Sequence, residues 1–209
     1  MSSLFFDLDG TLTDPKAGII SSVHYALDKL GIAERPDDLD WVIGPPLQES
    51  FALIVGKDRA EEGVLAYREH YSVTGLYENV VYAGIEQLLA ELKATGHPLY
   101  VATSKPHVFA NPILERFGLA GYFDAVFGAE LDGTRGNKAD LLAYALKHTS
   151  ADAATSIMLG DRKHDILGAK ANGMKTISLL WGYGSRQEFE AAETDQIVAS
   201  VDELREVLL

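Results

Sequence analysis

The sequence contains no cysteine, so neither a disulfide nor a thiolate nucleophile is available to this protein. It also lacks a long apolar run, and no stretch approaches the roughly 20 residues that a membrane-spanning helix needs. The first residues do not have the basic start and long apolar stretch of a signal peptide, because Asp7 and Asp9 interrupt them. These absences predict a cytoplasmic protein that does not act at a membrane.

Basic residues are few. Lys and Arg total 18 against 31 Asp and Glu, which gives a formal charge of -13. Such a chain repels the backbone of nucleic acids over most of its surface, so we expect no nucleic-acid polymer as a partner. A small phosphorylated substrate is compatible with this charge if a metal ion and a few local cations neutralise it. A monomer and a dimer are both consistent with the composition.

Strand-like and helix-like stretches alternate from residue 84 onward. The helical pattern of residues 84–95 ends at Gly96, and a second helix is expected to begin near Pro106. Strands are predicted at residues 4–7, 98–102, 122–128, 156–159, 175–180 and 196–199, with helices at residues 138–148 and 166–172 and from Val201. This alternation predicts an α/β fold, with a Rossmann-like parallel sheet covered by helices on both faces. In such sheets, ligands bind at the carboxyl ends of the strands.

Residues 15–81 do not follow this alternation. An amphipathic helix ends at Gly31, and further helical patterns occur before Gly44, over residues 47–55 and over residues 59–71. No strand is expected in this segment. We therefore predict a small all-helical cap at residues 15–81, inserted after the first strand of a core made of residues 1–14 and 82–209.

The first predicted strand ends in the segment DLDGT. Residues two apart in a strand point to the same side, so Asp7 and Asp9 are expected to project into one space. Two carboxylates this close repel each other and favour a metal ion or a shared proton. Gly10 permits a sharp turn or a close backbone approach, and the Thr11 hydroxyl can bond to local backbone.

Three other strand ends carry polar side chains. Thr103 and Ser104 follow a strand, at the expected start of a helix whose free amides could bind an anion. Lys138 begins a helix, where its charge opposes the helix dipole, which indicates a role other than helix stability. Asp161 and Asp165 follow a further strand, and paired carboxylates of this kind suit Mg²⁺.

In order and spacing, these four segments resemble the four motifs of the haloacid dehalogenase-like superfamily of phosphohydrolases. DLDGT is similar to motif I, Thr103 to motif II, Lys138 to motif III and GDRKHD to motif IV. The resemblance covers essentially the whole chain and is strongest to the phosphoglycolate-phosphatase-like branch, within it to bacterial cytosolic 5'-nucleotidases. The longer segments that carry it are DLDGTLTDPKAGI, IGPPLQESF, YREHY, GNKADLLAYAL, GDRKHDILGAKANG and WGYGS.

The resemblance implies a mechanism for the motif I residues. Asp7 would be the nucleophile that forms an aspartyl-phosphate, and Asp9 would act as general acid and then as general base. One Mg²⁺ would be held by Asp7, the backbone carbonyl of Asp9 and Asp161. Asp165 would orient the site or bind a metal-bound water.

The resemblance also implies roles for motifs II and III. Thr103 would donate to a phosphoryl oxygen, and Lys138 would neutralise both Asp7 and the phosphoryl group. The further candidates for binding phosphate or substrate are Gly10, Thr11, Ser104, Lys105, Lys16 and Gly44.

Several of these candidates have a plain structural alternative. Lys105 could bind phosphate or be a solvated lysine at a helix start, and Lys16 could contact substrate or lie at a hinge. Gly44 belongs to a stiff GPP turn. The segment of residues 181–184 could line the rim of the site or pack against the end of the sheet, and His164, within GDRKHD, could face the site or lie at the surface.

The resulting hypothesis is a Mg²⁺-dependent phosphomonoester hydrolase that acts on a small metabolite. Nucleoside 5'-monophosphates are the first expected substrate class, and phosphoglycolate-type or sugar phosphates the second. Dehalogenation is disfavoured, because displacing a halide needs neither a metal nor an acid for the leaving group. A phosphonate hydrolase would need a cap lysine that forms an imine. A phosphomutase and a non-catalytic phosphate-sensing module are the remaining alternatives, although a sensor gains nothing from Asp9.

Overall fold

The computed structural model describes residues 1–209, which fold into two compact units. The first unit comprises residues 1–13 and 81–209, and the second comprises residues 14–80. No helix in either unit combines the length and the apolar character that crossing a membrane requires.

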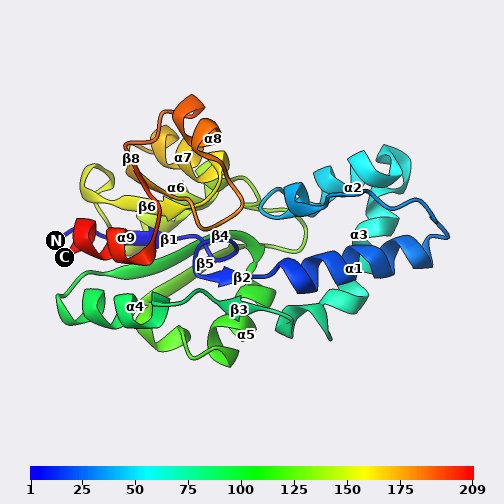
Figure 1. The fold of residues 1–209 in the computed structure, drawn as a ribbon. Helices are drawn as coiled ribbons and strands as arrows, with labels where there is room; N and C mark the ends of the chain where they lie inside the picture. The colour runs from blue at the N-terminus through cyan, green and yellow to red at the C-terminus, as the bar shows by residue number, and fades with distance from the viewer. The chain divides into compact units, whose positions relative to one another are not determined.

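The first unit is built on a parallel sheet of six strands (Figure 1). The strands are β1 (Leu4–Phe6), β4 (Leu99–Pro106), β5 (Ala125–Ala129), β6 (Ile157–Gly160), β7 (Lys175–Leu179) and β8 (Gln196–Val198). Their order in the sheet is β5-β4-β1-β6-β7-β8, so β1 lies in the middle. All of its pairings are parallel, which confirms the predicted α/β fold class.

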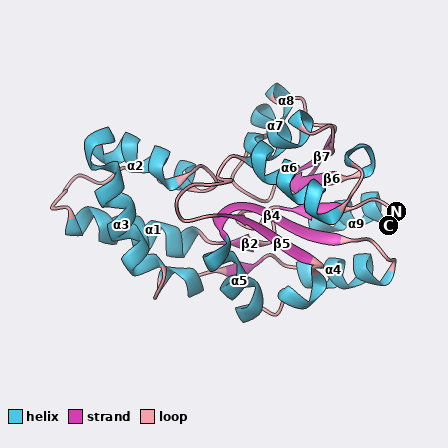
Figure 2. Cartoon of the chain, turned by 180° about the vertical axis from the view of Figure 1, so that it is seen from behind, coloured by secondary structure: helices cyan, strands magenta, loops and turns pink.

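Helices cover both faces of this sheet. They are α4 (Ile85–Ala94), α5 (His107–Arg116), α6 (Lys138–Thr149), α7 (Lys163–Ala171), α8 (Arg186–Ala191) and α9 (Val201–Leu208), with 3-10 helices η4 (Ala120–Tyr122) and η5 (Ala153–Thr155). Figures 1 and 2 show α6, α7 and α8 on one side and α4 and α5 on the other. The chain builds β4 and β5 on one side of β1 and then returns to build β6 on the other. Because each crossover is right-handed, this reversal places the later helices on the opposite face.

The core of the first unit surrounds β1, whose three residues are all at most 1% exposed. Phe5 packs with Ala102 and Met158 of the neighbouring strands, and with Leu141 and Leu142 of α6. A strand buried on both faces needs a continuous apolar run, which LFF supplies.

The register of β1 aligns the strand ends that carry the predicted site. Phe6 is level with Val101 on β4 and with Leu159 on β6. The residues that follow each of these positions therefore emerge at the same edge of the sheet. This edge lies where the strand order reverses, which is the usual ligand-binding position in open α/β sheets.

Three predicted boundaries in the first unit are wrong. Strand β5 begins at Ala125 and not at residue 122, because residues 120–122 form η4. The strand expected at residues 98–102 continues as β4 to Pro106, because β5 pairs with it as far as Pro106 and Ala129 across an irregular register. The next helix, α5, begins at His107, so Thr103 and Ser104 lie within a strand and not at a helix start. Helix α7 begins at Lys163, three residues before the expected start, because Asp165 caps its first turn.

The second unit is mainly helical. It contains α1 (Lys16–Lys29), α2 (Leu47–Val55) and α3 (Ala60–Tyr71), with 3-10 helices η1 (Asp40–Val42), η2 (Lys57–Arg59) and η3 (Gly75–Tyr77). Its core includes Val23 and Leu27 of α1, Phe51 of α2 and Tyr67 of α3. The Phe51 and Tyr67 rings meet edge to face, with their centroids 6.1 Å apart.

One further correction concerns the expectation of no strand at residues 15–81. Strand β3 (Val80–Val81) pairs with β2 (Thr13–Asp14) in a two-stranded sheet, at the positions where the chain passes between the two units. A strand of two residues is too short to produce a period-2 pattern, so it arises from pairing between distant segments.

Candidate active site

Three buried carboxylates meet at the edge of the central sheet. Asp7 follows β1, Asp161 follows β6 and Asp165 lies in the first turn of α7. One oxygen from each of the three lies within 4.8 Å of the others, and the residues are 6%, 0% and 2% exposed. Like charges this close and this dry repel strongly, so the cluster requires a compensating cation.

Lys138 supplies part of that compensation. Its Nζ lies 3.1 Å from Oδ1 of Asp7 and 2.7 Å from Oδ1 of Asp165, and it donates a hydrogen bond to the carbonyl of Ala102 at 2.9 Å. Burial lowers the pKa of Lys138, but the carboxylates of Asp165 and Asp7 outweigh burial and hold that pKa above its usual value. The ammonium group therefore stays charged. The position of Lys138 at the start of α6 allows it to make these contacts.

Local structure explains how α6 and α7 begin where they do. The Asn137 side chain accepts a hydrogen bond from the Ala139 amide and caps α6 directly before Lys138. In α7, Oδ2 of Asp165 accepts a hydrogen bond from the Arg162 amide at 3.1 Å. Burial raises the pKa of Asp165 to about 6, although Lys138 opposes this shift. Oδ2 of Asp165 thus caps the start of α7, while its Oδ1 forms the ion pair with Lys138.

Asp161 is held by donors from two different segments. Its Oδ1 accepts a hydrogen bond from the Thr11 hydroxyl at 3.4 Å, and its Oδ2 accepts one from the Tyr183 amide at 2.8 Å. Burial, with the charges of Asp165 and Asp7, raises the pKa of Asp161 well above its usual value. Gly10 has a φ of 78°, and a Cβ at this position would overlap the Asp161 carboxylate. Glycine is therefore required there both for conformation and for space.

Asp9 forms an ion pair with Lys105. The distance from Lys105 Nζ to Asp9 Oδ2 is 2.7 Å, and the two side chains are only 7% and 11% exposed. The alternative of a solvated Lys105 is therefore wrong. Oδ1 of Asp9 is buried without a hydrogen-bond partner. Burial raises the pKa of Asp9, while Lys105 works in the opposite direction.

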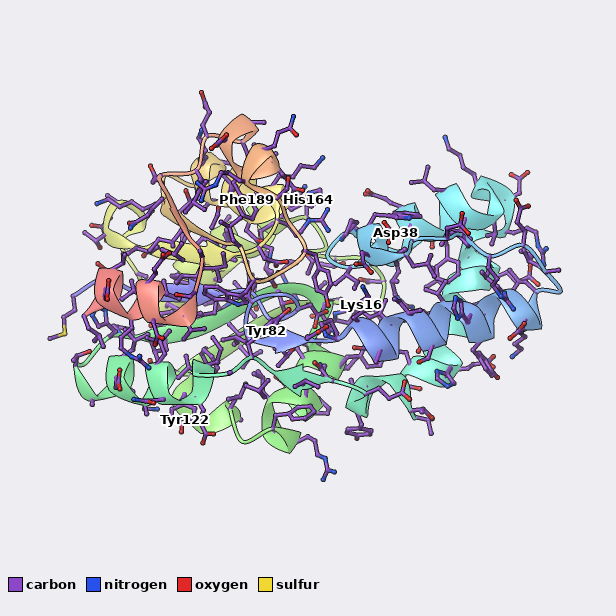
Figure 3. All side chains as sticks on the ribbon, in the orientation of Figure 1. Lys16, Asp38, Tyr82, Tyr122, His164 and Phe189 are labelled. Atoms are coloured by element: carbon purple, nitrogen blue, oxygen red, sulfur yellow. The ribbon has the colours of Figure 1, made fainter.

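The remaining predicted residues divide between the two units. Thr103 is buried on β4, next to β1, and its hydroxyl accepts a hydrogen bond from the Lys105 amide at 3.2 Å. Ser104 follows it and is half-buried. Lys16 and Gly44 belong to the second unit. Lys16 forms an exposed ion pair with Asp40 at 2.6 Å, and Figure 3 labels it together with Asp38.

The donor set fits a divalent magnesium ion. Asp7, Asp161 and Asp165 carry three negative charges against the one positive charge of Lys138, which leaves an excess of two. Mg²⁺ prefers a few carboxylates and completes its shell with water and phosphate oxygens. The raised pKa of Asp161 has the same origin, because a buried carboxylate without a cation is costly to ionise.

Comparison with known proteins identifies the family. Residues 4–179 match the family model described as haloacid dehalogenase-like hydrolase. The chain belongs to the haloacid dehalogenase-like hydrolases. It is an enzyme, and the predicted phosphatase class within this family is confirmed, as is the Rossmann-like core.

Three similar proteins show the range of this haloacid dehalogenase-like group. A protein of Pseudomonas aeruginosa named 5'-nucleotidase is 48% identical over 99% of this chain and 95% of its own length. The tyrosine-protein kinase PtkA of Mycobacterium tuberculosis is 41% identical over 98% of this chain and 72% of its own length. The crystal structure of a predicted phosphatase from Clostridium acetobutylicum superposes with a TM-score of 0.94, at 42% identity, over 99% of this chain and 97% of the other.

Sequence reasoning missed two features of this haloacid dehalogenase-like site. It predicted neither the ion pair of Lys105 with Asp9 nor the hydrogen bond from the Tyr183 amide to Asp161. The polar character of Lys105 beside Thr103 was a usable signal, but its partner lies almost a hundred residues away. His164 is half-buried, and burial together with the charges of Arg162 and Lys163 lowers its pKa.

Proposed function

We propose that this protein is a Mg²⁺-dependent phosphomonoesterase that acts on nucleoside 5'-monophosphates through an aspartyl-phosphate on Asp7. The observation that carries the proposal is the surroundings of Asp7. Its carboxylate lies 3.1 Å from the Lys138 ammonium and within 4.8 Å of the carboxylates of Asp161 and Asp165, and Asp9 follows two residues later with a raised pKa. This set combines a nucleophile, a proton donor and a metal-binding group at one strand end.

The first step would be attack of an Asp7 oxygen on phosphorus. Lys138 forms an ion pair with the Asp7 carboxylate and is placed to neutralise the negative charge of the phosphoryl group beside it. The Thr103 hydroxyl, on the adjacent strand, would donate to a phosphoryl oxygen, with Ser104 and the backbone at Gly10 and Thr11 as further contacts. A Mg²⁺ bound by Asp7, the Asp9 carbonyl and Asp161 would neutralise phosphoryl oxygens.

Asp9 would move the protons. Its carboxyl group would protonate the leaving oxygen in the first step, and the resulting carboxylate would take a proton from the water that hydrolyses the aspartyl-phosphate. Lys105 holds this carboxyl in place through Oδ2 and leaves Oδ1 without a protein partner. Proton transfer from this oxygen would break no hydrogen bond within the protein.

Two observations support the substrate class. The relative that is 48% identical over nearly the whole chain is named 5'-nucleotidase. The net charge of -13 suits a small phosphorylated metabolite better than a polymer. The second unit, at residues 14–80, would act as the cap that selects the substrate, with Lys16 and Gly44 as its candidate contacts.

A phosphate-release screen tests this function. Nucleoside 5'-monophosphates, phosphoglycolate, sugar phosphates and an aryl phosphate would each be assayed with Mg²⁺ and with EDTA, using the wild type and Asp7→Asn. We expect release from nucleotides with Mg²⁺, none with EDTA, and a loss on the order of 10³-fold or more in Asp7→Asn. The variant should form no acid-stable phosphoprotein and should keep the wild-type circular dichroism spectrum.

Other outcomes would replace the proposal. A preference for phosphoglycolate would change the substrate, and isomerisation of a sugar phosphate without phosphate release would indicate a mutase. Because one relative is named tyrosine-protein kinase, the screen includes one more assay, in which a tyrosine peptide is incubated with a nucleoside triphosphate. Peptide phosphorylation without hydrolysis of any monoester would contradict the phosphatase proposal.

A further inference from the structure

The segment Trp181–Gly184 lies against two of the site motifs. It follows β7, which is the neighbour of β6 in the sheet, with Ser178 level with Gly160. Because Asp161 follows Gly160, the chain leaving β7 emerges beside it. The first contact of the segment is the indole Nε1 of Trp181, which donates a hydrogen bond to the carbonyl of Thr11 at 3.1 Å.

The second contact is with the predicted metal ligand itself. The Tyr183 amide donates to Oδ2 of Asp161 at 2.8 Å, which is shorter than the 3.4 Å bond from the Thr11 hydroxyl to Oδ1. The segment thus donates a hydrogen bond to Asp161 itself. It also donates one to the carbonyl of Thr11, whose hydroxyl is the other donor to Asp161. Through these two bonds, one short segment fixes the distance between motif I and motif IV.

The two glycines allow this close approach. A Cβ at residue 182 would overlap the Gly10 carbonyl and the Asp161 carboxylate, and a Cβ at residue 184 would overlap the Asp161 carbonyl. Neither overlap involves the end of a flexible side chain on the surface. Glycine is needed at both positions because the segment lies directly on the backbone of the site.

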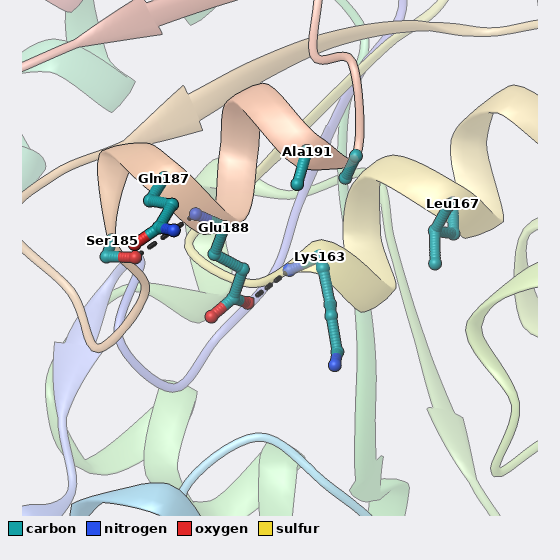
Figure 4. A pocket seen from close by; sticks show the side chains of 7 residues that line it. Lys163, Leu167, Ser185, Gln187, Glu188 and Ala191 are labelled. Atoms are coloured by element: carbon teal, nitrogen blue, oxygen red, sulfur yellow. Dashed lines mark hydrogen bonds between the residues drawn. The ribbon is translucent and has the colours of Figure 1, made fainter.

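The far end of the segment is anchored as well. Ser185 caps α8 by accepting a hydrogen bond from the Glu188 amide, and Glu188 in turn accepts one from the Lys163 amide at 2.7 Å (Figure 4). Arg162 also donates to Glu188, at 3.2 Å. Since α7 carries Asp165 in its first turn, the segment connects Thr11 at one end with the start of α7 at the other.

We propose that Trp181–Gly184 is a positioning segment that holds the Asp161 carboxylate ready for Mg²⁺, with the Trp181 indole as its anchor; the inference rests on the proposed function. Without the Tyr183 amide, Asp161 would keep only the 3.4 Å bond from the Thr11 hydroxyl against the repulsion of Asp7 and Asp165. Donors that orient a metal ligand typically contribute about 10- to 100-fold to metal affinity. Trp181 is a positioning residue, because its indole bonds to the Thr11 backbone.

The test is a measurement of Mg²⁺ affinity in the absence of substrate. The chain has two tryptophans, and both indoles donate to a backbone carbonyl, Trp41 to Asp38 at 3.0 Å in the second unit. Trp181→Phe and Trp41→Phe are therefore matched variants. Isothermal titration calorimetry should give a Kd for Mg²⁺ that is about 10-fold higher in Trp181→Phe. Trp41→Phe should retain the wild-type Kd.

A glycine pair extends the test. Gly182→Ala should weaken Mg²⁺ binding more than Trp181→Phe does, whereas Gly121→Ala, where a Cβ would meet nothing within 4 Å, should not. In Trp181→Phe, kcat should return toward the wild-type value as the Mg²⁺ concentration is raised, with the substrate KM unchanged. If Gly182→Ala does not fold, the Mg²⁺ affinity of Trp181→Phe still tests the positioning role.

The outcomes separate this inference from the function on which it rests. Equal Mg²⁺ affinities in Trp181→Phe and the wild type would overturn the positioning role, while phosphate release by the wild type would leave the function standing. An equal loss of affinity in Trp41→Phe would also overturn it. Failure of the wild type to bind Mg²⁺ would overturn both.

Discussion

At the scale of single residues, the main feature of the site is that several charged side chains are buried close together. Asp7, Asp161 and Asp165 share one dry space with a single ammonium, that of Lys138, while Asp9 and Lys105 form a separate pair. Burial raises the pKa of Asp9, Asp161 and Asp165. The residues that make the site suitable for phosphate chemistry therefore oppose folding when no cation is bound.

Replacing Asp9 should affect substrates according to their leaving groups. In Asp9→Asn the proposed proton donor is lost, so hydrolysis of nucleotides, whose alkoxide leaves poorly, should fall about 10²- to 10⁴-fold. An aryl phosphate needs less protonation of its leaving oxygen and should lose less activity in the first step. Steady-state rates on both substrates, with single-turnover release of the phenol, would measure the difference. Equal losses in the phenol burst would argue against Asp9 as the acid.

Replacing Lys138 should destabilise the fold. In Lys138→Met, Asp7 and Asp165 remain buried without their cation, and removal of one partner of a buried pair typically costs about 3–5 kcal/mol. Urea unfolding without metal would measure this loss. The double variant Lys138→Met/Asp165→Asn should recover part of it, and Lys93→Met, at an exposed lysine that donates to the Gly121 carbonyl, serves as the control. A fall no larger than that of the control would contradict the charge-pair explanation.

At the scale of elements, strand order decides which side chains meet. The ends of β4, β1 and β6 are adjacent in the sheet, although they lie far apart along the chain. Helices α6 and α7 each carry a charged residue of the site in their first turn. Lys138 opens α6, and Asp165 closes the first turn of α7. The positions at which α6 and α7 begin therefore determine where Lys138 and Asp165 place their charges.

The cap of α6 offers a test at this scale. The Asn137 side chain bonds to the Ala139 amide at 2.8 Å, and its loss in Asn137→Ala should lower the free energy of unfolding by about 1 kcal/mol. Asn137→Asp retains the acceptor and should stay close to the wild type. Urea unfolding measures the stability, and kcat with saturating Mg²⁺ reports whether Lys138 has moved. Equal stability of the Ala and Asp variants would show that the cap is not needed.

At the scale of the whole molecule, metal binding should be linked to folding. The proposed Mg²⁺ site forms only when β1, β6 and α7 have come together, so the ion would bind the folded state and stabilise it. At a free Mg²⁺ concentration of about 100 times the Kd, the expected gain is about 2.7 kcal/mol. Thermal unfolding with and without Mg²⁺ would measure this gain, and Asp161→Asn should lose most of it. A gain of the same size in Asp161→Asn would place the ion elsewhere.

The strand and helix pattern was largely predictable from the sequence, and two of the errors in strand assignment result from pairing with other strands. The extension of β4 to Pro106 depends on β5, and the two-residue strand β3 exists because it pairs with β2. The same distinction applies to the site. Asp7, Asp161 and Lys138 could be predicted because each stands at a strand end or a helix start, whereas the ion pair of Lys105 with Asp9 could not.

The sequence by itself determined the α/β architecture and the acids that end its strands, because apolar runs, glycines and carboxylates act through neighbours a few residues away. Only the tertiary structure decided how those acids are held. Lys105 reaches Asp9 across 96 residues of the chain, Trp181 reaches Thr11 across 170, and Tyr183 reaches Asp161 across 22. Contacts of this kind follow from the order of strands in the sheet, which local patterns do not encode.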